Sequence, residues 1–134
     1  MIPILMYHQI ADIPEAQNPN RYSVTPQMFE SQMSYLTSRG YQCISLLDAV
    51  NHVRNKQRIP RKSIVITFDD GYLDFYINAL PILERFGLVA TIFVVAERVG
   101  YKSDWPGMQG QNSAELMNWT QLDEICRSGM TVGS

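Results

Sequence analysis

The stretch SIVITFDDGY at positions 63–72 constrains the fold more than any other part of the sequence. Residues 63–68 form an apolar, β-branched run that is typical of a strand buried on both faces. The run ends abruptly in two adjacent carboxylates, Asp69 and Asp70, followed by Gly71. Because strands buried on both faces belong to parallel sheets covered by helices, this stretch favours an α/β fold.

Segments with strand and helix patterns alternate along the chain. Thr25 followed by Pro26 is typical of a helix N-cap and first helical position. Pro81 lies inside the helical pattern after the Asp-Asp-Gly, where it is expected to kink the helix or begin a new segment. The alternation predicts a parallel sheet with helices outside, as a barrel or an open doubly wound sheet.

The predicted elements have the following ranges. Besides 63–68, strands are expected at 2–7, 41–45, 89–95 and from 130 onward, and helices at 25–40, 46–55, 73–87 and 120–128. The apolar face of the third helix is predicted to hold Leu73, Tyr76, Ile77, Leu80 and Leu83. Residues 11–24 are rich in turn formers and are predicted to be a loop.

Composition excludes several classes of protein. With 134 residues, 46% of them hydrophobic and 18% charged, the chain suits a globular domain or part of a larger one. The net charge is −2 and the 11 basic residues are scattered, which argues against nucleic acid as a partner. No apolar run reaches the roughly 18 residues of a membrane span, and no signal peptide is recognisable, so the compartment stays open. Cys43 and Cys126 are interpreted as buried free thiols, with a disulfide as the alternative.

The two adjacent aspartates are the candidate catalytic feature. Neighbouring side chains of a strand point to opposite faces, so both can reach one cavity only where the strand ends and the backbone turns. Gly71 is expected to supply that turn, at the strand end where parallel α/β folds place their chemistry. A bound cation would neutralise one carboxylate and leave the other free to act as a base. The alternative is that Asp-Asp-Gly serves only as turn and helix-capping chemistry.

Longer segments resemble the polysaccharide deacetylase family, the NodB-homology carbohydrate esterases of the family 4 type. The resemblance is carried by ITFDDGY, NALPILERFG and ATIFVV, and also by PILMYHQI, VTPQMFESQMSYLTSRGY and MNWTQLDEICRSGMTVGS. It implies a distorted (β/α) barrel that removes N-acetyl or other acyl groups from an N-acetylated polysaccharide or oligosaccharide. Carried over to this chain, it makes Asp69 the general base and Asp70 a ligand of a divalent metal, commonly zinc.

The resemblance also sets expectations about what is missing. The family's second motif, H-[ST]-x-x-H, supplies two histidine ligands directly after a strand ending like VGS, and this sequence ends at Ser134. Residues 1–134 are therefore expected to be the N-terminal portion of one deacetylase domain, truncated before that motif, with about five strands of the barrel. The edges of the first and last strands are expected to be open, which favours self-association.

Three further residues are candidates for binding substrate. His8 follows the first strand and should lie at the same end of the sheet as Asp69 and Asp70, either lining the pocket or packing at the strand end. Tyr72 adjoins the motif, where substrate contact and packing are equally favoured. Trp105 lies in the long segment 96–118 with Tyr101 and either stacks on a sugar or anchors the loop. His52 is interpreted as a solvated surface residue and Trp119 as a packing residue.

Two functions of different classes remain open. The first is a metal-dependent hydrolase of N-acyl sugars, represented by an incomplete catalytic domain. The second is a non-catalytic protein that keeps the fold for carbohydrate binding or assembly. The presence of both Asp69 and Asp70 favours the hydrolase.

Overall fold

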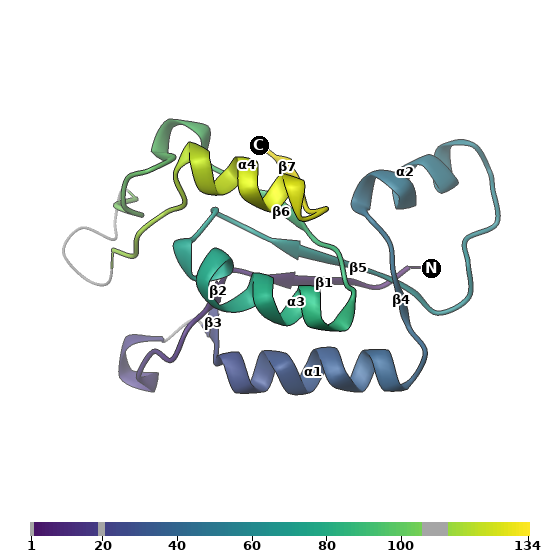
Figure 1. Ribbon diagram of the computed structural model, residues 1–134, viewed down its shortest axis with the longest axis horizontal. Helices are drawn as coiled ribbons and strands as arrows, with labels where there is room; N and C mark the ends of the chain where they lie inside the picture. Colours follow the sequence, from purple (N-terminus) through teal and green to yellow (C-terminus); the bar gives the residue numbers. More distant parts are fainter. Residues whose placement is uncertain (1, 19–20, 106–112) are drawn as a thin grey trace.

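A five-stranded sheet, parallel in every pair, forms the frame of the protein (Figure 1). The computed structural model describes residues 2–18, 21–105 and 113–134. The strand order is β1–β5–β6–β7, and β4 pairs with the beginning of β5. The predicted parallel α/β fold is confirmed. The sheet strands are β1 (Ile4–Tyr7), β4 (Gln42–Cys43), β5 (Ser63–Phe68), β6 (Thr91–Phe93) and β7 (Thr131–Gly133).

In Figure 1, α4, α3 and α1 lie one below another from the top to the bottom of the view, whereas α2 lies apart from them on the right. Their positions agree with the predicted ranges. The helices are α1 (Pro26–Ser38), α2 (Leu46–Arg54), α3 (Leu80–Phe86) and α4 (Trp119–Arg127), with 3-10 turns η1 (Glu15–Gln17) and η3 (Ala96–Arg98). The prediction of a plain loop at 11–24 was wrong. That segment contains η1 and the strand β3 (Ser23–Val24), which pairs with β2 (Gln9–Ile10), and strands this short leave no periodicity to detect.

Strand β5 is buried along its whole length and divides its side chains between two faces. Ile64, Ile66 and Phe68 belong to the main hydrophobic core beneath the helices. Thr67 lies on the opposite face and lines a cavity with Asp69. This alternation fixes which way the residues after Phe68 point, since a shift of one residue would reverse both faces.

Phe68 joins three elements through ring contacts. Its ring centroid lies 5.4 Å from that of Tyr7 in β1, 5.8 Å from Phe29 in α1 and 4.7 Å from Phe75. The rings of Phe29 and Phe75 meet it close to perpendicular, the arrangement that aromatic pairs favour over a face-to-face sandwich. The last residue before the two aspartates is therefore held from three sides.

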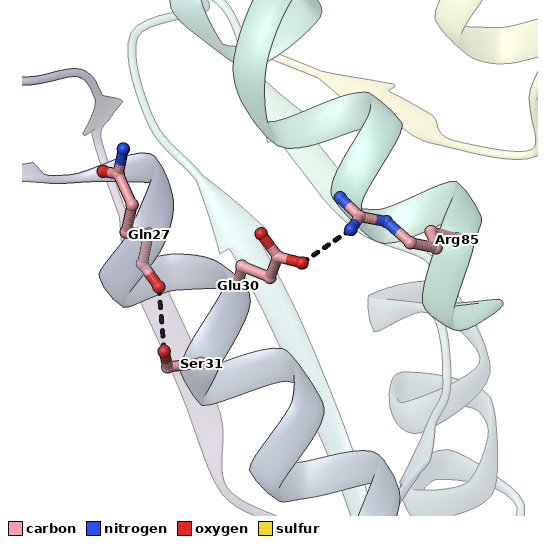
Figure 2. Close-up of polar contacts among 4 residues, drawn as sticks. All are labelled: Gln27, Glu30, Ser31 and Arg85. Atoms are coloured by element: carbon pink, nitrogen blue, oxygen red, sulfur yellow. Dashed lines mark hydrogen bonds and ion pairs between the residues drawn. The ribbon is translucent and has the colours of Figure 1, made fainter.

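Helix α1 packs against the core through its buried residues Phe29 and Met33, and an ion pair at the surface connects it to α3. Thr25 is the N-cap, as predicted, and its hydroxyl accepts a hydrogen bond from the Met28 N–H. Figure 2 shows the surface pair, in which Arg85 Nη1 lies 2.6 Å from Glu30 Oε1. The same view shows the Ser31 hydroxyl donating to the Gln27 carbonyl within α1. An exposed ion pair contributes less than about 1 kcal/mol, so the buried core of α1 dominates this contact.

A turn of π-helix, η2 (Phe75–Ala79), precedes α3, with Pro81 in the first turn of α3. Proline has no N–H to donate and its ring crowds the preceding turn, which explains why the helix widens here. The extra residue per turn rotates the apolar face. Ile77, predicted to be on that face, is 58% exposed, and Phe75 and Ala79 are buried instead.

Asp74 and Asn78 connect this helical segment to β2. Asp74 Oδ1 accepts the Ile10 N–H at 2.8 Å, and Oδ2 accepts the Gln9 side-chain amide at 3.4 Å. The Asn78 side-chain amide donates to the Ile10 carbonyl at 2.7 Å. Asp74 and Asn78 therefore satisfy both backbone groups of Ile10 in β2.

Strands β1 and β7 are the two ends of the strand order. Within the described residues, each of them pairs with a neighbour on one side and leaves its other edge unpaired. On β1, the side chains of Ile4 and Met6 are 56% and 61% exposed. Self-association through these edges stays a prediction.

In the described parts of the chain, no helix combines the length and apolar character needed to cross a membrane. Cys43 and Cys126 are both free, and Cys126 is exposed rather than buried as predicted.

Asp74 predicts a pH dependence of stability. Burial raises the pKa of its carboxyl to about 6, although the hydrogen bonds from Ile10 and Gln9 act in the opposite direction. Between about pH 4 and pH 6 the unfolded state loses this proton before the folded state does, so stability falls as the pH rises. Asp74→Asn has no such titration. We expect the free energy of unfolding of the wild type, relative to the variant, to fall by roughly 1–3 kcal/mol across this window.

Urea unfolding at several pH values measures this difference. Asp123→Asn, at an exposed carboxylate of α4, is the matched control and should follow the wild type. A constant difference between the wild type and Asp74→Asn from pH 4 to pH 7 would contradict the prediction.

Candidate active site

The carboxyl ends of the central strands meet at one edge of the sheet. The Asp69 N–H donates to the Tyr7 carbonyl at 2.9 Å, and the Val94 N–H donates to the Gly133 carbonyl at 2.8 Å. An open cavity of about 500 Å³ adjoins this edge. Asp69 and Asp70 line it, together with Ile4, Met6, Leu46, Thr67, Phe93, Val94 and Val95.

The backbone at Asp70 and Gly71 explains how two adjacent aspartates share one cavity. Asp69 continues the alternation of β5 and points to the same face as Thr67. Asp70 has φ +72° and Gly71 has φ +73°, so the left-handed turn begins at the aspartate and not only at the predicted glycine. Aspartate is one of the few residues that visit this region, at a cost of about 1–2 kcal/mol. A strained backbone that is retained beside a cavity is a feature of functional sites.

Gly71 is required by its surroundings as well as by its backbone. A Cβ atom at this position would lie 2.9 Å from Val94 Cγ1. The close approach lets the loops after β5 and β6 pass each other at the edge of the cavity. Only glycine meets both conditions without displacing Val94.

The electrostatic environment of Asp70 is mixed. Burial raises the pKa of its carboxyl above the ordinary value, and the charge of Asp69 acts in the same direction. The imidazole of His8 and a hydrogen bond from the Tyr72 hydroxyl act in the opposite direction. The His8 imidazole and the Asp69 carboxylate therefore both lie within electrostatic reach of Asp70.

His8 lies near Asp70, as its position after the first strand predicts. Its ring stacks on that of Tyr22, with centroids 4.7 Å apart and an interplanar angle of 21°. Tyr22 is 53% exposed and was missed by sequence reasoning, because it lies in the segment predicted to be a loop. His52 is half-buried in α2, and its Nδ1 has no hydrogen-bond partner within the described structure, so the prediction of a solvated side chain was wrong.

The aromatic candidates separate into buried and exposed residues. Tyr72 is 7% exposed, and Trp105 is half-buried. Tyr101 is 68% exposed and Trp119 is 67% exposed, so Trp119 is not the packing residue that was predicted. The substrate-binding roles of His8, Tyr72 and Trp105 stay predictions.

The described residues do not supply a complete set of metal ligands. Among the described residues, no group of three or more His, Cys, Asp and Glu side chains is arranged to hold a metal ion. Catalytic zinc sites typically use about three protein ligands. The carboxylate of Asp70 fits the role of a single ligand, but the described residues do not complete a site.

Comparison with known proteins assigns the family. The model of the polysaccharide deacetylase family matches residues 56–134, which is more than half of the chain and includes the two aspartates. The chain belongs to this family. The sequence resemblance is thereby confirmed, and with it the NodB-type partial barrel.

Individual deacetylases are similar to this chain over most or nearly all of its length. YxkH of Bacillus subtilis (strain 168) is 37% identical over 101 residues, covering 75% of this chain and 34% of that protein. Poly-beta-1,6-N-acetyl-D-glucosamine N-deacetylase of Escherichia coli (strain K12) is 30% identical over 127 residues, covering 92% and 19% respectively. The solved structure of IcaB from Ammonifex degensii superposes with a TM-score of 0.82 at 28% identity, covering 98% of this chain and 51% of that one. The chain thus spans about a third or less of these curated relatives.

A pair of glycine variants tests the close approach at the site. Gly71 and Gly87 both have positive φ, but a Cβ at Gly87 meets nothing within 4 Å. Both Gly71→Ala and Gly87→Ala should lose about 1–2 kcal/mol from the left-handed backbone. Gly71→Ala should lose a further ~1–3 kcal/mol from overpacking against Val94. Equal unfolding free energies for the two variants in urea would show that the Val94 contact imposes no cost.

Proposed function

We propose that the protein containing this chain is a hydrolase that removes N-acetyl groups from an amino-sugar polymer. The observation that carries the proposal is the pair Asp69 and Asp70, both lining the cavity at the carboxyl end of the central parallel strand. Membership of the polysaccharide deacetylase family supports the reaction. The similarity to poly-beta-1,6-N-acetyl-D-glucosamine N-deacetylase supports a polymer of N-acetylated glucosamine as the substrate class.

In this proposal the two carboxylates have different roles. Asp70 is one ligand of a divalent cation, zinc foremost, and the described residues alone do not complete its ligand set. When bound, such a cation would polarise the acyl carbonyl and make a water easier to deprotonate. Asp69 accepts the proton of the water that attacks the acyl carbon, and so acts as the general base.

The surroundings of the two residues support this division. Asp69 is held at the end of β5 by its N–H bond to the Tyr7 carbonyl, in line with the packed strand. Asp70 lies one residue further on a left-handed backbone, and the His8 imidazole acts to lower the pKa of its carboxyl. Rigid placement of a base matters because proton transfer requires hydrogen-bond reach to the reacting water.

Matched asparagine variants of the full-length protein test the two roles. Asp69→Asn should lower the release of acetate from N-acetylated glucosamine oligomers by about 10²–10⁴-fold while the bound metal is retained. Asp70→Asn should lower the metal content itself, and asparagine is chosen because it tolerates the left-handed backbone. Acetate release and elemental analysis are the two measurements.

Asp123→Asn, on the exposed surface of α4, is the control and should keep both activity and metal. Equal loss of metal in the Asp69 and Asp70 variants would contradict the division of roles. Full activity of both variants would contradict the hydrolase and favour a carbohydrate-binding protein that keeps the fold.

A further inference from the structure

We propose that a second cavity, outside the cavity of the two aspartates, is a binding subsite for further units of a neutral, hydroxyl-rich glycan chain. The cavity measures about 480 Å³ and lies between the segment after β6 and the start of α4. Tyr101, Lys102, Glu115, Asn118 and Gln121 are among the residues that line it. The inference rests on the proposed function, because it assigns part of that function's polymer to a surface outside the catalytic cavity.

The two cavities adjoin opposite ends of one short segment of chain. Asp69 and Asp70 line the first cavity, and Leu73, which follows closely in the sequence, lines the second. Among the described residues the two cavities have no lining residue in common. The Cα atoms of residues 70 and 73 can be at most about 11 Å apart, so a polymer, unlike a single sugar unit, can contact both cavities at once.

Backbone pairing fixes the wall of the second cavity that comes from the segment after β6. The Leu116 N–H donates to the Tyr101 carbonyl at 2.9 Å, and Lys102 and Glu115 form an antiparallel bridge. The Glu115 carbonyl also accepts the Leu73 N–H at 2.9 Å, which ties this wall to the segment after the aspartates. A lining that is already ordered loses less conformational entropy when a ligand binds.

Tyr101 supplies an apolar surface at this cavity. Its backbone is paired, but its side chain is 68% exposed. None of the ring contacts found within the described structure involves it. A phenol combines an apolar ring face with a polar hydroxyl. The C–H face of a sugar ring can therefore pack on Tyr101 while the hydroxyls of the sugar reach the polar lining.

The start of α4 supplies amide donors that are held in place. Asn118 Oδ1 accepts the Gln121 N–H at 3.0 Å, and Gln121 Oε1 accepts the Asn118 N–H at 2.9 Å. This capping box occupies both side-chain oxygens and leaves the two NH₂ groups as donors. Within the described residues, neither NH₂ group has a hydrogen-bond partner. Both amides are thus oriented before a ligand arrives.

The charged residues of the cavity balance one another. Arg98 and Lys102 are cationic, and Asp104 and Glu115 are anionic. Arg98 Nη1 lies 2.8 Å from Asp104 Oδ1, whereas Lys102 and Glu115 form no ion pair within the described residues. A lining without net charge gives no general preference for an anion or a cation. Its ammonium, carboxylate and amide groups match the hydroxyls of neutral N-acetylated sugar units, because a hydroxyl both donates and accepts.

Variants of Tyr101 in the full-length protein test the subsite. Each is made in the Asp69→Asn background, where the proposed function predicts suppressed turnover. Isothermal titration calorimetry then measures the binding of a disaccharide and of a longer oligomer of N-acetylglucosamine. Tyr101→Ala should weaken binding of the longer oligomer by about 3–10-fold, the typical contribution of one aromatic contact. Tyr101→Phe keeps the ring and should keep most of that affinity.

Tyr35→Ala, at a 57% exposed tyrosine of α1, is the matched control and should bind the longer oligomer as the parent protein does. Equal affinity of Tyr101→Ala and the parent for the longer oligomer would overturn the subsite. So would a parent that binds the longer oligomer no more tightly than the disaccharide. A steep loss of affinity with added salt would show that the ligand is recognised by charge, and would overturn the neutral occupant.

The release of acetate by the protein with Asp69 intact judges the proposed function separately. Acetate release together with unchanged oligomer affinity in Tyr101→Ala would overturn the subsite and leave the function standing. Absence of acetate release together with weakened oligomer affinity in Tyr101→Ala would overturn the function and leave a glycan-binding subsite.

Discussion

The burial of β5 is the constraint on which the rest of the structure depends. All six of its residues are buried, and it pairs with β1, β4 and β6. Its last residue, Phe68, contacts rings of β1, α1 and η2, so the strand end is the point where the sheet and the helical layer are joined. Burying such a ring contributes about 2–3 kcal/mol, and the same contacts fix the direction of the residues that follow.

Because the ring contacts hold Phe68 in place, the backbone directly after it can take strained φ angles. Asp70 and Gly71 both take left-handed backbone angles, and Gly71 passes close to Val94. Such a turn persists only where the surrounding structure determines it on several sides. Three sets of hydrogen bonds hold this turn. The Tyr7 carbonyl of β1 accepts the Asp69 N–H, Met117 and Glu115 pair with Gly71 and Leu73, and Asp74 accepts the Ile10 N–H. The packed core thus fixes the strand end, and the strand end places both carboxylates in one cavity.

Membership of the polysaccharide deacetylase family gives this geometry a chemical meaning, and the structure adds how the geometry is maintained. The returning part of the segment after β6 pairs with the backbone directly after the two aspartates. The Met117 N–H donates to the Gly71 carbonyl, the Leu73 N–H donates to the Glu115 carbonyl, and Tyr72 bridges to Leu116.

The sequence by itself determined the parallel α/β fold, the main strands and helices, the Thr25 cap, the disruption at Pro81 and the two aspartates at a strand end. These features depend on periodicity and on the chemistry of adjacent residues. Only the tertiary structure decided that Asp70 itself is left-handed, that Ile77 is turned outward and that Tyr22 stacks on His8. The turn at Asp70 and Gly71 is held by Val94 and Met117, more than 20 positions away, and His8 meets Tyr22 across an intervening turn, so a local pattern contains no information about these contacts.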